Sequence, residues 1–139
     1  MSIPAAVVDV GWVNGLAAIR SLGRAGIRVL AVDHRPSALG FRSKYGERML
    51  SPDPFTDEHG FVNFLRALGE VVVFPTHDDS LNAIARYADD LGVLTPFPDW
   101  SVLERVQSKR AQLDQASTQC DWFGSIHVAF RTNRVCMRP

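Results

Sequence analysis

Cysteine, long apolar runs and surplus charge are all scarce in this sequence, and each absence disfavours a class of protein. The two cysteines, Cys120 and Cys136, both lie near the C-terminal end. Two cysteines so placed cannot build the disulfide framework typical of small secreted proteins. We therefore expect a reducing compartment, the cytoplasm.

Membranes and nucleic acids are also disfavoured as partners. No apolar run approaches the ~20 residues of a membrane span, and the N-terminus lacks the basic region and apolar stretch of a secretory signal. Fifteen Lys and Arg residues balance fifteen Asp and Glu residues. Net charge therefore supplies none of the attraction that drives generic binding to nucleic acid or anionic lipid.

The composition is that of a folded domain. The chain has 139 residues, of which 46% are hydrophobic and 22% charged, close to globular averages. This length suits one domain and leaves no room for a second full one.

Short apolar segments ending at glycine, proline or polar residues predict the strands of a buried sheet. They are residues 5–10, 28–33, 47–51, 71–74 and a brief fifth piece, 93–95.

Apolar residues at helical spacing predict helices between these strands. They cover residues 16–22, 61–68, 81–91 and a last stretch from 101 towards 116. The alternation predicts an α/β fold with three layers, a mostly parallel sheet of about five strands and helices on both faces. Ligands of such folds bind beyond the carboxyl ends of the strands.

The end of the chain differs in composition from the rest. Residues 117–139 carry both cysteines but no Lys and no Glu. We interpret residues 1–116 as one domain and residues 117–139 as an atypical tail.

Residue order in four segments, 8–33, 40–46, 74–80 and 103–110, resembles the N-terminal domain of ATP-grasp carboxylate–amine ligases. Residues 8–33, with the turn from Gly11 to Gly15, are similar to the opening strand, turn, helix and strand of that family. Residues 40–46, 74–80 and 103–110 resemble later segments of the same domain, so the likeness covers about residues 4–116. It implies a pre-ATP-grasp, Rossmann-like fold. It also implies a ligase that uses ATP and Mg²⁺ to make an acyl phosphate, which an amine then attacks.

The resemblance further implies that the ATP-clamping residues belong downstream of this domain. Residues 117–139 do not continue the family pattern, which leads to the hypothesis that a frame change or early stop has replaced the catalytic portion. We therefore expect no catalytic residue here, and no tight binding of ATP or Mg²⁺ to this chain. Lys109 matches a lysine at the entrance to the ATP-grasp region, with an ordinary surface lysine as the alternative.

Two segments are candidates for substrate binding. Gly11, Asn14 and Gly15 follow the first strand, where backbone N–H groups and a helix N-terminus can hold an anion. Their Gly-x-x-x-Gly spacing lacks the middle glycine of the dinucleotide fingerprint, so a purely structural turn is the alternative. Asp33, before His34 and Arg35, is either a ribose-contacting carboxylate or part of a solvated loop.

His77, Asp78 and Asp79 follow the fourth strand. A histidine beside two carboxylates can orient a polar substrate or transfer a proton. Capping of the next helix by Asp78 or Thr76 explains the same residues.

The remaining chemistry-bearing patterns are weak. Cys120, His127 and Cys136 fit no familiar metal-ligand spacing, so no metal site is expected. The sequence has no nucleophile elbow and no phosphate-binding Gly-Lys-Ser or Gly-Lys-Thr.

The sequence thus predicts a substrate-site domain of an ATP-grasp ligase that binds a small carboxylate or amine and is not catalytic alone. The alternative is a free-standing module for a small carboxylate or nucleotide, acting with a partner chain. Exposed apolar surface distinguishes the two: a last helix that normally packs on a missing domain would leave an apolar patch near Val102, Val106 and Leu113, and such a patch favours association with a partner chain or a second copy. A Rossmann-type oxidoreductase fragment is a third possibility, disfavoured by the missing glycines.

Overall fold

The computed structural model describes residues 3–96, 100–110 and 113. The chain divides into two compact units, Met1–Asp99 and Trp100–Pro139, and each is described here by itself. The predicted boundary at residue 116 and the tail 117–139 lie outside the described residues.

The first unit is built on a parallel sheet of four strands. They are β1 (Ala5–Val8), β2 (Val29–Asp33), β3 (Gly46–Leu50) and β4 (Val72–Pro75), in the spatial order β3-β2-β1-β4. Every residue of β1 and β2 is buried, which is why these strands read as unbroken apolar runs.

The predicted fifth strand is reduced to a single bridge, so the expectation of about five strands is corrected to four. Leu94 pairs with Val72: its N–H donates to the Val71 carbonyl at 3.1 Å, and its carbonyl accepts from Val73 at 2.9 Å. The next two bonds of a parallel ladder would need N–H groups from Pro96 and Pro75. Proline has no N–H, so the pairing stops.

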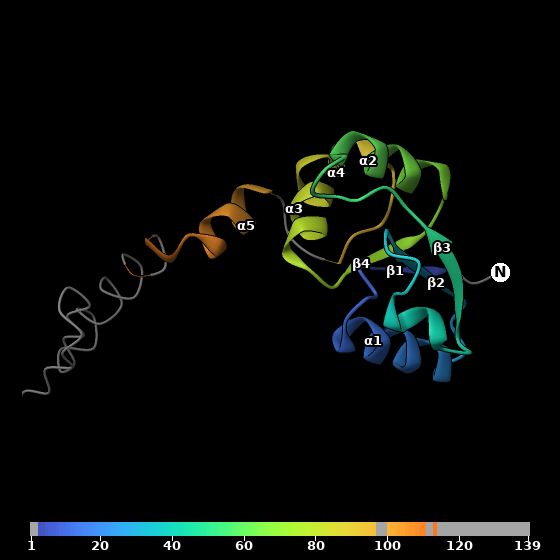
Figure 1. The fold of residues 1–139 in the computed structure, drawn as a ribbon. Coiled ribbons are helices and arrows are strands. Elements are labelled where there is room, and N and C mark those ends of the chain that lie inside the picture. The colour runs from blue at the N-terminus through green and yellow to red at the C-terminus, as the bar shows by residue number, and fades with distance from the viewer. Residues whose placement is uncertain (1–2, 97–99, 111–112, 114–139) are drawn as a thin grey trace, which may run out of the picture. The chain divides into compact units, whose positions relative to one another are not determined.

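Helices cover both faces of the sheet, which confirms the predicted three-layer α/β fold (Figure 1). One face carries α1 (Val13–Arg24) and the short 3₁₀ turn η1 (Leu39–Arg42). The other carries α2 (Glu58–Ala67), α3 (Asp78–Arg86) and α4 (Ala88–Leu91).

Alternate residues along the strands supply two separate cores, because successive side chains of a strand point to opposite faces. The α1 side buries Val7, Val10, Ile19, Val29 and Ala31. The side of α2, α3 and α4 buries a larger set: Ala6, Val8, Leu30, Val32, Phe61, Val62, Leu65, Val71, Val73, Ala83, Ile84 and Leu91.

The helix predicted over residues 81–91 is two helices. Tyr87 leaves the helical region, with φ −111° and ψ 16°, and separates α3 from α4. Gly92 adopts the left-handed conformation that ends α4 (φ 63°), as its sequence position indicates.

In the second unit, α5 (Trp100–Gln107) confirms the start of the last predicted helix. Val102, Val106 and Leu113 are 41%, 56% and 40% exposed. Within residues 3–96, 100–110 and 113, no helix has both the length and the apolar character that crossing a membrane requires.

Helix α1 begins unusually close to the end of β1. A Cβ on Gly15 would lie 2.6 Å from the Val10 Cα and 3.2 Å from the Asp9 carbonyl oxygen. Both neighbours are main-chain atoms, which cannot move aside as a flexible side chain can. Gly15 therefore allows the helix to pack against the strand end.

We predict that Gly15→Ala destabilises the domain by about 1–3 kcal/mol, because the added methyl overpacks this contact. The effect opposes the ~1 kcal/mol that alanine gains over glycine inside a helix. Urea unfolding measures the change. Ala17→Gly, at an exposed position on the same helix, measures how much the difference in helix propensity between alanine and glycine contributes to stability in α1. A Gly15→Ala protein more stable than the parent would show that the close contact does not constrain the fold.

Candidate functional site

A cavity of ≈ 240 Å³ lies at the carboxyl edge of the sheet, where ligands of parallel α/β folds bind. Its lining comes from the segments that follow all four strands. The lining residues are Asp9, Trp12, His34, Arg35, Asp53, Pro54, Phe55, His77 and Asp79.

The backbone at the end of β1 is fixed from β4. Thr76 donates its N–H to the Val8 carbonyl at 3.2 Å, and its hydroxyl donates to the carbonyls of Val8 and Asp9 at 2.9 and 2.8 Å. Asp9 is left with φ 61°, the single positive φ among the described residues other than glycine. Aspartate tolerates this conformation better than most residues, but it is strained relative to a strand.

The carboxyl group of Asp9 is buried in the cavity wall. Asp9 is 5% exposed, and its Oδ2 has no hydrogen-bond partner among the described residues. Burial raises the pKa of this carboxyl, and the charge of Asp33 raises it further. A hydrogen bond from Ser80 and the nearby His77 and His34 act in the opposite direction. The net result is a pKa above the ordinary value of an aspartate.

A second buried carboxylate, Asp33, anchors the loop after β2. Its Oδ1 accepts from the Arg35 N–H at 2.8 Å and from Arg35 Nε at 3.2 Å, whereas its Oδ2 has no partner among the described residues. The Arg35 guanidinium lies over the Trp12 ring, 5.3 Å from its centroid. Asp33 is fully buried, so its interpretation as part of a solvated loop is wrong.

Two histidines of the cavity each lie near carboxylates. His34 Nδ1 is 3.8 Å from Asp33 Oδ1, and its Nε2 is 4.0 Å from Asp53 Oδ2. His77 Nδ1 is 3.4 Å from Asp79 Oδ2. The cavity therefore contains groups that accept hydrogen bonds, groups that donate them, and groups that can gain or lose a proton. This combination suits a small polar ligand.

The structure brings two of the predicted substrate residues to this cavity. His77 and Asp79 line it, from the loop before α3 and from its first turn. Gly11 is not a lining residue but packs against two neighbours of the cavity: a Cβ there would collide with the Arg35 guanidinium and approach Asp33 Oδ2 to 3.1 Å. Because Gly11 has no Cβ, the Arg35 guanidinium has room to form its ion pair with Asp33.

The other predicted residues lie elsewhere. Asn14 and Asp78 line a separate, open hollow, where the Asn14 side chain donates to the Thr76 carbonyl at 2.6 Å. Gly15 has the packing role described above, and it lines none of the hollows described here. Lys109 belongs to the second unit, so its prediction as an ATP-binding residue stays a prediction.

Neither of the predicted helix caps is present. The residue before α3 is His77, and its side chain makes no capping hydrogen bond. The hydroxyl of Thr76 is directed to the end of β1 instead. Asp78 is the first residue of α3, where its negative charge is favourable near the helix N-terminus.

Several cavity residues were not singled out as site residues from the sequence. The sequence pattern predicts Asp9 inside a strand that runs to Val10, although a lone acid in an apolar run is itself a signal of special burial. Trp12, Asp53 and Phe55 carry no motif that marks them.

Comparisons with known proteins identify no relative, so function is inferred from the residues, the fold and the cavity. No family model matches the chain, and no curated protein matches it either. Within the part of the chain described here, no group of three or more His, Cys, Asp or Glu side chains is arranged to hold a metal ion.

We predict that Asp9→Asn stabilises the protein at neutral pH by about 0.5–2 kcal/mol. Asparagine tolerates positive φ and carries no buried charge. The raised pKa means that the folded state binds the Asp9 proton more tightly than the unfolded state does. Its contribution to stability is therefore largest at acid pH and is lost as pH rises through the folded pKa.

Urea unfolding of parent and variant at several pH values between 4 and 8 tests this prediction. The stability difference should grow with pH and then level off. Asp89→Asn, an exposed carboxylate on α4, should change stability by less than about 0.5 kcal/mol. A less stable Asp9→Asn protein at neutral pH would mean that the ionised carboxylate stabilises the fold.

Proposed function

We propose that this chain provides the substrate-site domain of an ATP-grasp carboxylate–amine ligase, holding a small polar substrate at the carboxyl edge of its sheet. The observation that carries the proposal is the cavity to which the ends of all four strands contribute. The order of motifs along residues 4–116 supports the choice of ligase family.

The dimensions of the cavity favour a substrate of amino-acid size. Its ≈ 240 Å³ lies below the ~300–1,000 Å³ of pockets that hold drug-sized ligands. Trp12 and Phe55 give it an apolar wall, and carboxylates, an arginine and two histidines give it polar contacts. A compact molecule with charged ends matches this combination.

The nucleotide chemistry is assigned to another part of the ligase. The sequence has neither the dinucleotide fingerprint nor a Gly-Lys-Ser or Gly-Lys-Thr phosphate loop. In the family that the chain resembles, ATP and Mg²⁺ bind downstream of this domain. In this proposal the domain selects and positions a substrate, and it does not activate a carboxylate by itself.

A free-standing binding module that works with a partner chain is the second candidate. The observation in its favour is the exposure of Val102 and Leu113 in the second unit. Exposed apolar side chains are a common feature of association surfaces. In both candidates the same cavity holds the ligand. They differ in the location of the ligase activity, which in the second candidate would belong to the partner chain.

Ligand screening tests the proposed function. We expect at least one small carboxylic acid, amine or amino acid, at millimolar concentration, to raise the melting temperature, whereas Mg-ATP does not. Isothermal titration then gives the affinities. Micromolar binding of Mg-ATP alone, about −8 kcal/mol, would place a nucleotide site in this chain and contradict the proposal. So would a panel in which no small molecule binds.

A further inference from the structure

We propose that the cavity binds the amine partner of the ligation rather than the carboxylate partner, and that the Asp9 carboxylate holds the cationic nitrogen of this ligand. The inference rests on the proposed function and identifies the substrate class of the same site. It follows from an unpartnered oxygen of a buried carboxylate, from the distribution of charge and from the cavity wall.

The unpartnered oxygen of Asp9 is the first argument. Buried polar atoms in folded proteins almost always have a hydrogen-bond partner, because burial without one costs free energy. Asp9 lines the cavity, and its Oδ2 is buried without a partner among the described residues. A carboxylate oxygen only accepts hydrogen bonds, so the missing partner is a donor, and an ammonium supplies both donors and the opposite charge.

The charges that line the cavity also favour a cation. Three carboxylates line it, Asp9, Asp53 and Asp79, against a single arginine, Arg35, among the lining residues. Arg35 is already paired with Asp33, which reduces its ability to attract an anion. A carboxylate ligand would therefore meet more repulsion than attraction here.

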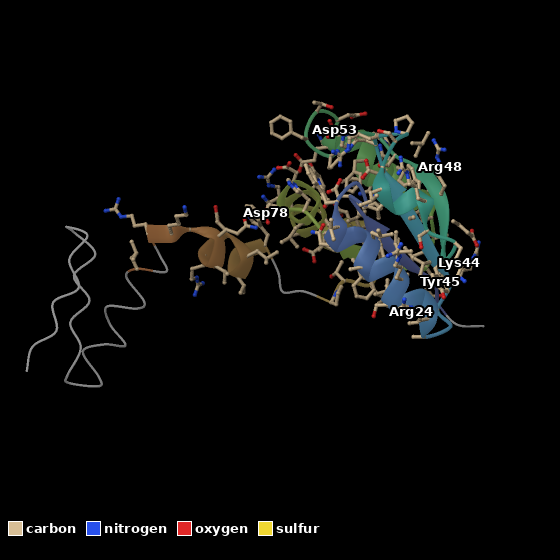
Figure 2. The ribbon with its side chains drawn as sticks, turned by 60° about the horizontal axis from the view of Figure 1, so that its bottom comes forward. Arg24, Lys44, Tyr45, Arg48, Asp53 and Asp78 are labelled. Atoms are coloured by element: carbon tan, nitrogen blue, oxygen red, sulfur yellow. The ribbon has the colours of Figure 1, made fainter. Side chains whose placement is uncertain are left out.

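Arg86 on α3 lines a neighbouring hollow that shares Pro54, Phe55 and Asp79 with the cavity, and it pairs with Glu58 at 3.3 Å. Several other basic residues lie farther away. Arg24, Lys44 and Arg48 lie on the side of the domain away from Asp78 at the start of α3 (Figure 2). Of the eight Asp and Glu residues in residues 51–96, Asp53 and Asp79 line the cavity, and Asp9 adds a third carboxylate. The local field at the cavity is therefore more negative than the balanced net charge of the chain indicates.

An aromatic ring completes the site. Phe55 lines the cavity and is 77% exposed, and its N–H donates to Asp53 Oδ1 at 2.9 Å, which fixes this loop. An aromatic face next to a carboxylate favours an organic cation, because the ring attracts positive charge and covers the carbon chain. A hydrated inorganic ion gains less from such a wall.

Three probes of equal carbon-chain length separate the possible ligand classes: 1,4-diaminobutane, 4-aminobutanoate and butanoate. We expect the two amines to bind and butanoate not to bind, by isothermal titration at pH 7.5. Shifts of the Trp12 indole N–H in NMR spectra locate the binding at the cavity. Asp9→Asn should weaken amine binding at least tenfold, whereas Asp89→Asn leaves it unchanged.

The pH dependence provides a second readout. The groups that face Asp9 are Asp33 on β2, His34 after it, His77 before α3 and Ser80 on α3. Protonation of Asp9 removes the negative charge that holds the amine, so amine affinity should fall as pH falls through the raised pKa of this carboxyl. Asp9→Asn should remove the part of this pH dependence that is due to Asp9.

The outcomes distinguish this inference from the proposed function. If butanoate binds as well as the amines, or if Asp9→Asn retains full amine affinity, the amine assignment is wrong while a substrate-site domain stands. If neither these probes nor the wider panel bind, the proposed function fails and the amine assignment fails with it.

Discussion

The site depends on how the first strand ends. The N–H and hydroxyl of Thr76, at the end of β4, hold the carbonyls of Val8 and Asp9. This turns Asp9 into a left-handed conformation and leaves its carboxyl group buried at the carboxyl edge of the sheet. The free energy lost to strain and burial at Asp9 must be offset by the two apolar cores of the domain. A carboxylate kept in such an unfavourable position is typical of functional sites, where ligand binding supplies the missing interaction.

The parallel sheet places other polar and aromatic side chains near Asp9, because it brings the carboxyl ends of all four strands to one edge. Residues that are far apart in the sequence, such as Trp12, His34, Phe55 and His77, line one cavity for that reason. The site needs no long insertion and no second domain to form its walls. A cation bound there would lower the cost of burying Asp9, so binding and stability are linked at this residue.

The sequence predicts the scaffold well and the site in part. The three-layer fold and the main helices follow from apolar periodicity and from glycines such as Gly92. The burial of Asp9 depends instead on Thr76, a neighbour in space but not in sequence, and no local pattern reveals it. The burial of Asp33 similarly requires that Arg35 fold back over Trp12. The missing fifth strand could have been foreseen from Pro75 and Pro96 only once the strand register was known.

The most direct test of this account is the titration of the Asp9 carboxyl carbon by carbon-detected NMR. The measurement compares the free folded protein, the protein unfolded in urea, and the folded protein with 1,4-diaminobutane. We predict a midpoint in the free folded protein that is higher than in the unfolded chain, and a lower midpoint when the diamine is present. A midpoint equal to or below that of the unfolded chain, and unchanged by the diamine, would contradict the role given to Asp9.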